Sequence, residues 1–361
     1  MKIMTILGTR PEIIRLCLVI RRLDDLCDHV IVNTGQNYDA NLSDVFFEEL
    51  GVRAPDHELG ARGSFGEQIG TMLAGTERVM RAEKPDRFLV LGDTNSSLAA
   101  IMAKRIGIPV YHMEAGNRGY DDRVPEEVNR RIIDHSSTIL LPYTERSRQN
   151  LLREGIAADR IYVTGNPIFE VLTHFDQEIT ASSVREKLGV AAKKYFLATI
   201  HRAETVDEDD RLTSVVQALR AIHSKYGQPI LWSVHPHTRK RLTSLGLDPE
   251  HLEGVRCLQP LGLFDFVALE KTARCVLTDS GTVQEECSIF GIPSVTLRDV
   301  TERPETIEAG SNMLAGVRVD DILRALEVVL SVPPTWEPPT GYLDKDVSTK
   351  VVKIVLRGVA A

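Results

Sequence analysis

The sequence has no surplus of basic residues. Its 43 Lys and Arg residues stand against 51 Asp and Glu residues, which gives a formal net charge of -8 at pH 7. Sequence-independent binding to nucleic acid or to anionic lipid draws on a basic surface. The charge therefore argues against nucleic-acid and membrane partners, and an anionic ligand would need a local cluster of Arg and His.

Paired cysteines, long apolar runs and a dinucleotide fingerprint are also missing. No run of about 18 apolar residues and no signal-peptide pattern occurs, so we expect a cytoplasmic protein. No G-x-G-x-x-G motif occurs, so a nicotinamide cofactor has no support, and we expect no cofactor. No His, Cys or carboxylate set has metal-ligand spacing, so we expect no metal. The cysteines are odd in number and scattered, which predicts reduced core thiols: Cys17, Cys27, Cys257, Cys275 and Cys287.

The length and the apolar pattern predict two α/β domains. A chain of 361 residues is long enough for two domains of roughly 100 to 200 residues each. Short apolar runs alternate with helical patterns, which predicts parallel sheets covered on both faces. The expected strands are Lys2–Leu7, Val30–Asn33, Phe88–Leu91, Pro109–Met113, Thr138–Leu141, Arg160–Val163, Tyr195–Ile200, Ile230–Val234, Val255–Leu258, Cys275–Leu277 and Ser294–Leu297.

The same pattern places the domain boundaries. The first doubly wound, Rossmann-like domain is expected over residues 1–172, completed by a C-terminal helix at about 347–361, and the second over residues 173–346. The Pro-rich piece Val332–Pro339 is interpreted as a connector. Ligands of doubly wound sheets bind beyond the carboxyl ends of the strands. We therefore expect the two domains to face each other across a cleft.

Acidic and basic residues follow several strands of the first domain. Gly8–Glu12 puts Arg10 and backbone amides at a helix start, where an anion is favoured. Asp93 and Glu114 end two successive strands, and Glu126 and Arg130 stand at the next helix start. Gly8–Glu12 alone is equally well explained by an ordinary strand-to-helix turn, and each acid alone is more often a cap or a surface salt bridge. Their occurrence on three successive loops favours one site.

The second domain has a matching set of loops. His201 and His235 each follow a strand, where His can neutralise a pyrophosphate or donate a proton. Ser280 and Gly281 open a helix that carries Glu286, an arrangement suited to phosphate and ribose hydroxyls. A plain capping box is the competing explanation. Arg303 lies on a further polar loop.

Taken in order, the motifs GTRPE, GDT, HMEAG, RVPEEVNR, HRAE, VHPHTR, DSGTVQEE and TERPE resemble those of the non-hydrolysing UDP-N-acetylglucosamine 2-epimerases. The resemblance spans nearly the whole chain. It implies the glycosyltransferase-type-B architecture of two Rossmann-like domains, a homodimer, a small-molecule UDP-sugar substrate and no redox cofactor. It also implies anti elimination of UDP to a 2-acetamidoglucal, followed by re-addition of UDP with the proton returned to the other face.

The resemblance also implies roles for individual residues. The positions that match the family's catalytic residues are Asp93, Glu114, Glu126 and His201. The positions assigned to UDP-sugar binding are Arg10, Arg15, Arg130, His235, Phe266, Ser280, Gly281, Glu286 and Arg303. Which acid removes the C2 proton and which returns it stays open.

Departures from the family pattern leave the substrate open. Arg15 replaces a common Lys, 36–38 read Gln-Asn-Tyr in place of Gln-His-Arg, and Ala203 replaces an Arg, so allosteric activation by a second substrate molecule is not carried over. The segments 35–39 and 116–118, with the shortened stretch to 123–125, resemble the subgroup that epimerises L-fucosamine precursors or diacetamido uronates. A glycosyltransferase of the same fold, a hydrolysing relative and an inactive nucleotide-sugar sensor are competing hypotheses for the function.

Overall fold

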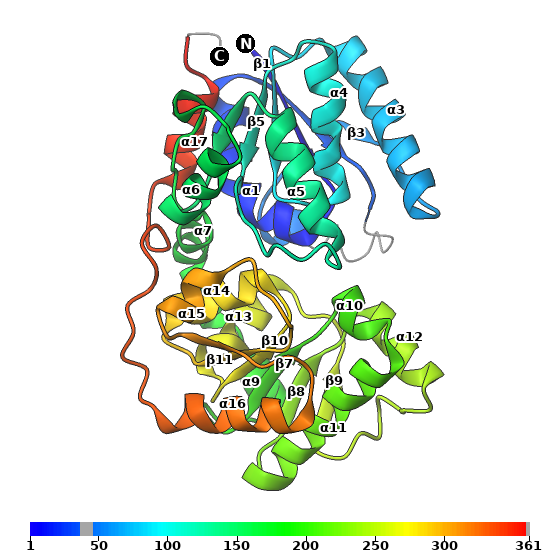
Figure 1. Ribbon diagram of the computed structural model, residues 1–361, viewed down its shortest axis with the longest axis vertical. Coiled ribbons are helices and arrows are strands. Elements are labelled where there is room, and N and C mark those ends of the chain that lie inside the picture. Colours follow the sequence, from blue (N-terminus) through cyan, green and yellow to red (C-terminus); the bar gives the residue numbers. More distant parts are fainter. Residues whose placement is uncertain (37–45, 359–361) are drawn as a thin grey trace. The chain divides into compact units, whose positions relative to one another are not determined.

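The computed structural model describes residues 1–36 and 46–358 of the chain. The described residues form two compact units (Figure 1). The first comprises Met1–Thr173 together with Thr340–Ala361, and the second His174–Pro339.

The first unit is built on a six-stranded parallel sheet with the order β3-β2-β1-β4-β5-β6. Its strands are almost wholly apolar and buried, as strands covered by helices on both faces must be. The bounds are β1 (Lys2–Leu7), β2 (Asp28–Asn33), β3 (His57–Glu58), β4 (Arg87–Leu91), β5 (Val110–Met113) and β6 (Ile139–Leu141).

Helices cover both faces of this sheet. The chain runs outward from β1 to β3 and then returns to β4, β5 and β6, so right-handed crossovers place α1 on one face and α3, α4 and α5 on the other. The bounds are α1 (Arg10–Leu26), α3 (Phe65–Glu83), η1 (Asn95–Ala99), α4 (Ala100–Arg105), α5 (Pro125–Ser136), α6 (Glu145–Arg153), η2 (Ala158–Arg160), α7 (Ile168–His174) and α17 (Val347–Val355).

The C-terminal helix α17 completes the first unit. In Figure 1 it is the red helix beside the blue α1, with which it packs. Ser348 at its start donates a backbone hydrogen bond of 2.7 Å to Glu170, and the guanidinium of Arg22 donates to the Ser348 hydroxyl over 2.8 Å. At its end, Arg87 donates to the carbonyls of Val355 and Arg357.

The second unit repeats the design with the sheet order β12-β11-β10-β7-β8-β9, again parallel. Trp232 on β8 is fully buried in the core that lies between the sheet and α11 and α16. Its strands are β7 (Phe196–Thr199), β8 (Ile230–Ser233), β9 (Val255–Leu258), β10 (Val276–Thr278), β11 (Ser294–Thr296) and β12 (Asn312–Leu314).

A second core lies on the opposite face of this sheet, where residues of α13 and α14 pack against β7 and β10. The helices of the unit are α8 (Asp176–Ala181), α9 (Val184–Leu188), α10 (Ala203–Val206), α11 (Asp209–Tyr226), α12 (Pro236–Ser244), α13 (Leu263–Thr272), α14 (Gly281–Phe290), α15 (Pro304–Glu308) and α16 (Val319–Ser331).

The expectation of two Rossmann-like, doubly wound parallel sheets is confirmed. One expected strand is wrong: the stretch 160–163 forms only an isolated parallel bridge between Leu140 and Ile161. Arg160 closes the short helix η2 and turns its guanidinium back onto the carbonyl of Thr138 at 3.0 Å. The short edge strands β3 and β12 were not expected from the sequence, because two or three residues carry no detectable alternation.

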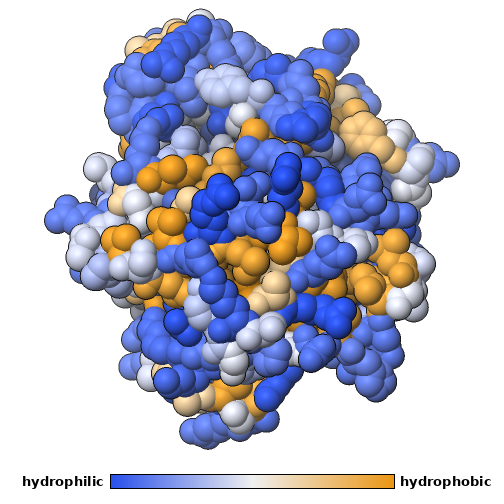
Figure 2. Space-filling model, turned by 60° about the horizontal axis from the view of Figure 1, so that its bottom comes forward, coloured by the Kyte–Doolittle hydropathy of each residue, from blue (hydrophilic) through white to orange (hydrophobic). Residues whose placement is uncertain are grey.

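The surface alternates hydrophilic and apolar side chains. Figure 2 shows apolar residues, in orange, between hydrophilic ones, in blue, on the displayed face. Some apolar exposure is normal for folded chains. Across the described part of the chain, no helix combines the length and the apolar character needed to span a bilayer.

Candidate functional site

Three loops that carry predicted site residues lie together at the carboxyl edge of the first sheet. They follow β1, β4 and β5, which are consecutive neighbours in that sheet. Because the strands are parallel, their carboxyl ends meet at one edge. The prediction that Asp93 and Glu114 follow neighbouring strands is therefore confirmed.

The loop after β1 presents Arg10 at the start of α1. A Cβ atom at Gly8 would lie only 2.0 Å from Thr34 Oγ1, so glycine alone fits this turn. The Arg10 guanidinium lies 5.4 Å from the centre of the Phe46 ring, and burial lowers its pKa. Among the residues that the structure describes, no carboxylate pairs with Arg10.

The carboxylate of Glu12 holds the loop after β1 in place. One carboxylate oxygen accepts hydrogen bonds from the amides of Gly8 and Thr9 at 2.9 and 2.7 Å, and the other accepts from the Thr94 hydroxyl. Burial raises the pKa of Glu12 to about 7, against hydrogen bonds from Thr94 and Thr9 that lower it. Sequence reasoning missed this residue, although its position in a capping box was a signal.

Asp93 is held by the helix that carries Glu126. Arg130 on α5 donates from Nε to Asp93 Oδ2 over 2.8 Å, and Asn129 donates to the Asp93 carbonyl over 2.9 Å. Arg130 is itself buried and also contacts Glu127. The structure thus brings two predicted site residues, Asp93 and Arg130, into one ion pair.

Glu114 lies in the left-handed backbone region, with φ at 67°. Its carboxylate contacts the buried Arg15 guanidinium and accepts a hydrogen bond of 3.3 Å from the Tyr143 hydroxyl. A Cβ atom at Gly92 would lie 3.9 Å from Glu114 Oε2, so this carboxylate sits beside the Asp93 loop. A bulky residue with positive φ costs backbone energy, which is a frequent feature of functional sites.

Glu126 stands in the first turn of α5, half-buried, and its neighbour Glu127 points inward. Glu127 accepts hydrogen bonds from the amides of Gly119 and Tyr120 at 3.0 and 3.1 Å. The two adjacent acids therefore differ in role: Glu127 holds the preceding loop, and Glu126 stands more exposed at the helix start.

In the second unit, His201 follows β7 and is held by Asp279, which follows the neighbouring β10. Asp279 is fully buried, and its Oδ2 accepts from the amides of His201 and Arg202 at 2.8 and 2.7 Å. The other oxygen lies 3.4 Å from His201 Nδ1, and 40% of the His201 side chain is exposed. Sequence reasoning quoted Asp279 only as part of a motif and missed this contact.

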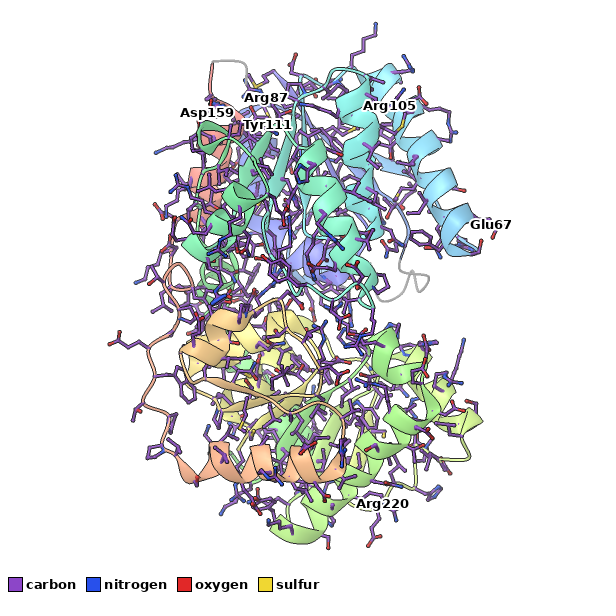
Figure 3. The ribbon with its side chains drawn as sticks, in the orientation of Figure 1. Glu67, Arg87, Arg105, Tyr111, Asp159 and Arg220 are labelled. Atoms are coloured by element: carbon purple, nitrogen blue, oxygen red, sulfur yellow. The ribbon has the colours of Figure 1, made fainter. Side chains whose placement is uncertain are left out.

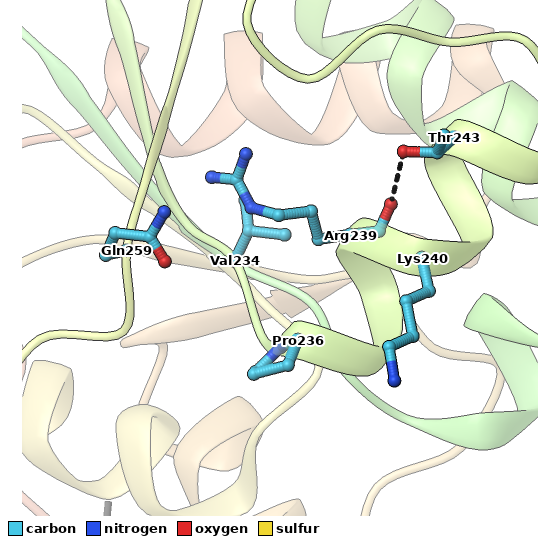
Figure 4. Close-up of a pocket in the computed structure, with 6 residues that line it drawn as sticks. All are labelled: Val234, Pro236, Arg239, Lys240, Thr243 and Gln259. Carbon is cyan, nitrogen blue, oxygen red and sulfur yellow. Dashed lines mark hydrogen bonds between the residues drawn. The ribbon is translucent and has the colours of Figure 1, made fainter. Parts of the chain in front are cut away.

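His235 caps α12 at the carboxyl end of β8, where its Nδ1 accepts from the His237 amide at 3.3 Å. A pocket of about 360 Å³ lies beside this helix start (Figure 4). Its lining includes the cationic Arg239 and Lys240, which suit an anionic ligand. The lining residues are Val234, Pro236, Arg239, Lys240, Thr243 and Gln259.

Ser280 and Gly281 open α14 as its N-cap and first residue. A Cβ atom at Gly281 would lie 2.7 Å from Glu302 Oε1, so the small residue permits this approach. Glu286, one turn further on, is buried, and burial together with the charge of Glu286 raises the pKa of Glu270 well above its usual range. Phe266 is half-buried on α13.

Arg303 is buried and paired, as are Arg15 and Arg130 among the predicted binding residues. Its guanidinium contacts the carboxylate of Glu285, and its Nη1 lies 3.4 Å from the carbonyl of Glu302. Two further departures from the family pattern concern position 203 and positions 37 and 38. Ala203 is the first residue of α10, whereas positions 37 and 38 lie outside the described residues. In residues 1–36 and 46–358, no group of three or more His, Cys, Asp or Glu is placed to hold a metal.

Comparison with known proteins extends over nearly the whole chain. Residues 21–356 match the sequence profile described as UDP-N-acetylglucosamine 2-epimerase. A Methanocaldococcus jannaschii protein named UDP-N-acetylglucosamine 2-epimerase is 42% identical, covering 94% of this chain and 95% of its own. A Pseudomonas aeruginosa protein named UDP-2,3-diacetamido-2,3-dideoxy-D-glucuronate 2-epimerase is 40% identical, covering 91% and 92%.

Among solved structures, the crystal structure of M. jannaschii UDP-GlcNAc 2-epimerase in complex with UDP-GlcNAc and UDP is similar to this chain with a TM-score of 0.94. The two are 41% identical, and the match covers 98% of this chain and 99% of the other. The profile, the relatives and the fold agree with the resemblance that the sequence motifs carry. The chain belongs to the UDP-N-acetylglucosamine 2-epimerase family.

Proposed function

We propose that this protein is a non-hydrolysing UDP-N-acetylglucosamine 2-epimerase, which interconverts UDP-N-acetylglucosamine and UDP-N-acetylmannosamine. The observation that carries the proposal is the arrangement at the carboxyl edge of the first sheet. Asp93 and Glu114 follow neighbouring strands, Glu126 opens the helix that binds Asp93, and Arg10 lies at the adjacent helix start. The 42% identity to the M. jannaschii protein supports the same reaction.

The chemistry needs such a site because the C2 proton of the sugar is not beside a carbonyl. A carboxylate removes the proton while the C1–O bond breaks, so that the electron pair forms the C1–C2 double bond and UDP leaves with the bonding electrons. Return of a proton to the opposite face of C2 and attack of UDP on C1 restore the nucleotide sugar. Carboxylates near C2 and cationic donors at the pyrophosphate are the groups that this sequence of steps requires.

The acids of the first unit are assigned to the proton transfers. Arg130 beside Asp93 and Arg15 beside Glu114 favour the ionised carboxylates, the form that a base needs. Arg10 is assigned to a phosphate.

The second unit is assigned to UDP. His235, Ser280 and Gly281 supply donors at two helix starts, where an anion is favoured. Glu286 is assigned to the ribose, and Phe266 to the uracil side of the nucleotide. His201, backed by Asp279, is the fourth catalytic candidate. Arg303, which pairs with Glu285, is a second-rank candidate for the sugar or phosphate region, as is Arg130.

One observation favours a second substrate. The P. aeruginosa relative, named for a diacetamido glucuronate, is 40% identical over nearly the whole chain, close to the value for the M. jannaschii relative. The reaction at C2 is the same for both sugars, whereas the substituents at C3 and C6 differ. The second candidate function is therefore that of a C2 epimerase of a modified UDP-2-acetamido sugar.

The test is proton NMR of the purified protein with UDP-N-acetylglucosamine in deuterated water, without added metal or nicotinamide. The expected result is the manno epimer with deuterium at C2. Exchange of UDP-2,3-diacetamido-glucuronate alone would select the second substrate. Absence of exchange with every UDP-sugar would overturn the epimerase, and transfer of the sugar to an acceptor would establish a glycosyltransferase.

We further infer that the protein works as a homodimer in the cytoplasm. All five cysteines are free, and three are buried, as befits a reducing compartment. Family likeness supports the dimer. Light scattering coupled to size exclusion tests it, and a monomeric mass with full activity would contradict it.

A further inference from the structure

Beneath the loops of Asp93 and Glu114 lies a buried cluster of charged side chains that the proposed mechanism does not use. His112 on β5 is 1% exposed, and Asp134 on α5 is fully buried. Their side chains meet at 2.8 Å, between His112 Nδ1 and Asp134 Oδ1. Arg118 donates to Asp134 Oδ2 over 2.7 Å and reaches Glu154 over 2.6 Å.

The partners of His112 determine which ring nitrogens carry protons. Its second nitrogen, Nε2, lies 2.9 Å from the carbonyl oxygen of Gly92. A carbonyl oxygen can only accept, so Nε2 must donate. Burial raises the pKa of Asp134, but hydrogen bonds and charge from His112 and Arg118 outweigh it and leave that pKa lowered. Asp134 is therefore a carboxylate that also only accepts, and both nitrogens of His112 are protonated in this arrangement.

A second His–Asp pair in the same unit, between the buried His29 and the exposed Asp24, shows the contrast. His29 at the start of β2 contacts Asp24 through Nδ1 at 2.7 Å and the Thr5 hydroxyl through Nε2 at 2.8 Å. A hydroxyl donates as well as accepts, so a neutral imidazole satisfies both contacts there. Burial accordingly lowers the pKa of His29. His112 has no such freedom, because Gly92 offers a carbonyl.

The cluster holds the backbone on either side of the proposed acids. The Gly92 carbonyl belongs to the peptide that leads into Asp93. Asp134 Oδ2 also accepts from the amide of Gly116, two residues after Glu114, at 3.1 Å. Gly92, Glu114 and Gly116 all have positive φ, at 73°, 67° and 80°. Such backbone persists only where the surroundings fix it.

Asp134 also ties these loops to the helix that begins beside Glu126. It lies on α5, whose Arg130 binds Asp93. The cluster therefore connects three elements: the ends of β4 and β5 and the helix α5. Each of them carries one acid of the proposed site.

We propose that His112 and Asp134 are positioning residues for the epimerisation: their buried ion pair fixes the peptides that aim Asp93 and Glu114 at the sugar. The inference rests on the proposed function. A misplacement of about 1 Å in a catalytic group can cost roughly 10²-fold in rate. A buried ion pair retained only for stability would make no such demand on the rate.

Two substitutions of His112 separate its two contacts. The amide nitrogen of Asn replaces Nδ1 and that of Gln replaces Nε2. H112Q therefore retains the hydrogen bond to Gly92, whereas H112N retains the one to Asp134 and releases the Asp93 loop. We expect H112N to lower kcat by roughly 10²-fold, because it releases the Gly92 carbonyl. H112Q keeps that contact and loses the one to Asp134, so it should lower kcat by a smaller factor, with KM changed by less than about 3-fold in both.

The control is His29→Asn, which removes the contact of buried His29 with Asp24 at the amino end of β2, away from the carboxyl edge of the sheet. It should lower the melting temperature and leave kcat unchanged. If H112N and H112Q lowered kcat equally, in proportion to their loss of melting temperature, His112 would be structural only and the proposal would be overturned.

A measurement without turnover tests the protonation itself. In the whole protein labelled with ¹⁵N-histidine, His112 should show two slowly exchanging ring N–H signals at neutral pH, and His29 one. A single N–H for His112 would overturn the ion pair even if the enzyme is active. Conversely, two signals in a protein that exchanges no UDP-sugar would leave the ion pair intact and overturn the proposed function.

Discussion

The Glu12 carboxylate accepts a hydrogen bond of 2.8 Å from the Thr94 hydroxyl and so joins the loop after β1 to the loop after β4. Its other oxygen holds the amides of Gly8 and Thr9. One buried side chain thereby connects the loop of Arg10 with the loop of Asp93. The two loops carry a proposed phosphate ligand and a proposed acid, so their spacing depends on Glu12.

The stability of the fold should depend on pH through Glu12. Burial raises its pKa to about 7 from the ordinary 4.5, so the folded state binds the proton more tightly than the unfolded chain. The stabilisation that protonated Glu12 gives to the folded state is fully present below pH 4.5. It is lost as the pH rises through 7, which lowers the free energy of unfolding by about 3 kcal/mol in all. Glu12→Gln should remove this dependence. Urea unfolding of both proteins at pH 5 and pH 8 measures it.

Glu67 provides the matched control, because it forms the same capping box at the start of α3 while exposed to solvent. Figure 3 labels it at the outer end of that helix. Hydrogen bonds from Ser64 lower the pKa of Glu67, so its contribution is present at higher pH and is lost as the pH falls. The Glu67 contribution to the free energy of unfolding therefore depends on pH in the opposite direction to that of Glu12, and E67Q should remove it. Identical profiles for wild type and E12Q would contradict the prediction.

Replacing Asp93 by Asn should abolish most of the turnover without unfolding the protein. Asn retains an oxygen that accepts from Arg130, which donates over 2.8 Å in the wild type, but it cannot act as a base. The loss in kcat should be about 10²- to 10⁴-fold, the range typical of a general acid or base. C2 deuterium exchange measures the rate, and calorimetric titration with UDP checks that the nucleotide still binds.

The exposed Asp159, labelled in Figure 3, is the control for this change. Asp159→Asn should retain full exchange. Glu114→Gln should behave as Asp93→Asn does. If both acid variants kept wild-type turnover, the assignment of these acids would be wrong, whatever the identity of the sugar.

The sequence predicted the sheets because buried parallel strands are continuous apolar runs, and β4 and β5 are clear examples. It predicted the carboxyl-edge loops because polar motifs follow those runs directly. The edge strands β3 and β12 escaped detection because they are two and three residues long. The stretch 160–163 was wrongly expected as a strand because apolar content does not reveal that Arg160 ends a helical turn.

Contacts between loops were beyond the sequence. Asp134 lies 22 positions from its partner His112, and Asp279 lies 78 positions from His201. No spacing rule links residues at such separations, because strand order and register bring them together. For the same reason the pairing of Arg303 with Glu285 could not be predicted from the sequence.

Asp279→Asn should impair the proposed acid–base role of His201. Asp279 Oδ1 lies 3.4 Å from His201 Nδ1, which favours a proton on that nitrogen. An Asn amide group at this position would donate to Nδ1 instead, and so would favour the tautomer of His201 that carries its proton on Nε2. Such a change of tautomer can cost a His-dependent enzyme several orders of magnitude in rate. We expect a loss in kcat of at least about 10-fold with UDP affinity retained, measured by exchange and calorimetry.

The control is the exposed pair of Asp248 and His251 in the same unit, joined at 2.6 Å. Asp248→Asn breaks a His–Asp contact on the surface and should leave kcat unchanged. Equal kcat values for D279N, D248N and wild type would show that Asp279 only supports the backbone.

Arg87→Met should loosen the C-terminal helix. The buried Arg87 guanidinium donates to the carbonyls of Val355 and Arg357 and lies 5.6 Å from the centre of the Tyr111 ring. Figure 3 labels Arg87 and Tyr111 near one another and Arg105 on α4. Hydrogen bonds from a charged group contribute about 1.5 to 3 kcal/mol, so R87M should lower the free energy of unfolding by a similar amount. Amide hydrogen exchange should rise first in α17.

The control is the exposed Arg105→Met, which should change the free energy of unfolding by less than about 0.5 kcal/mol. Unchanged amide exchange of α17 in R87M would contradict the prediction and would show that packing against α1 alone retains the helix.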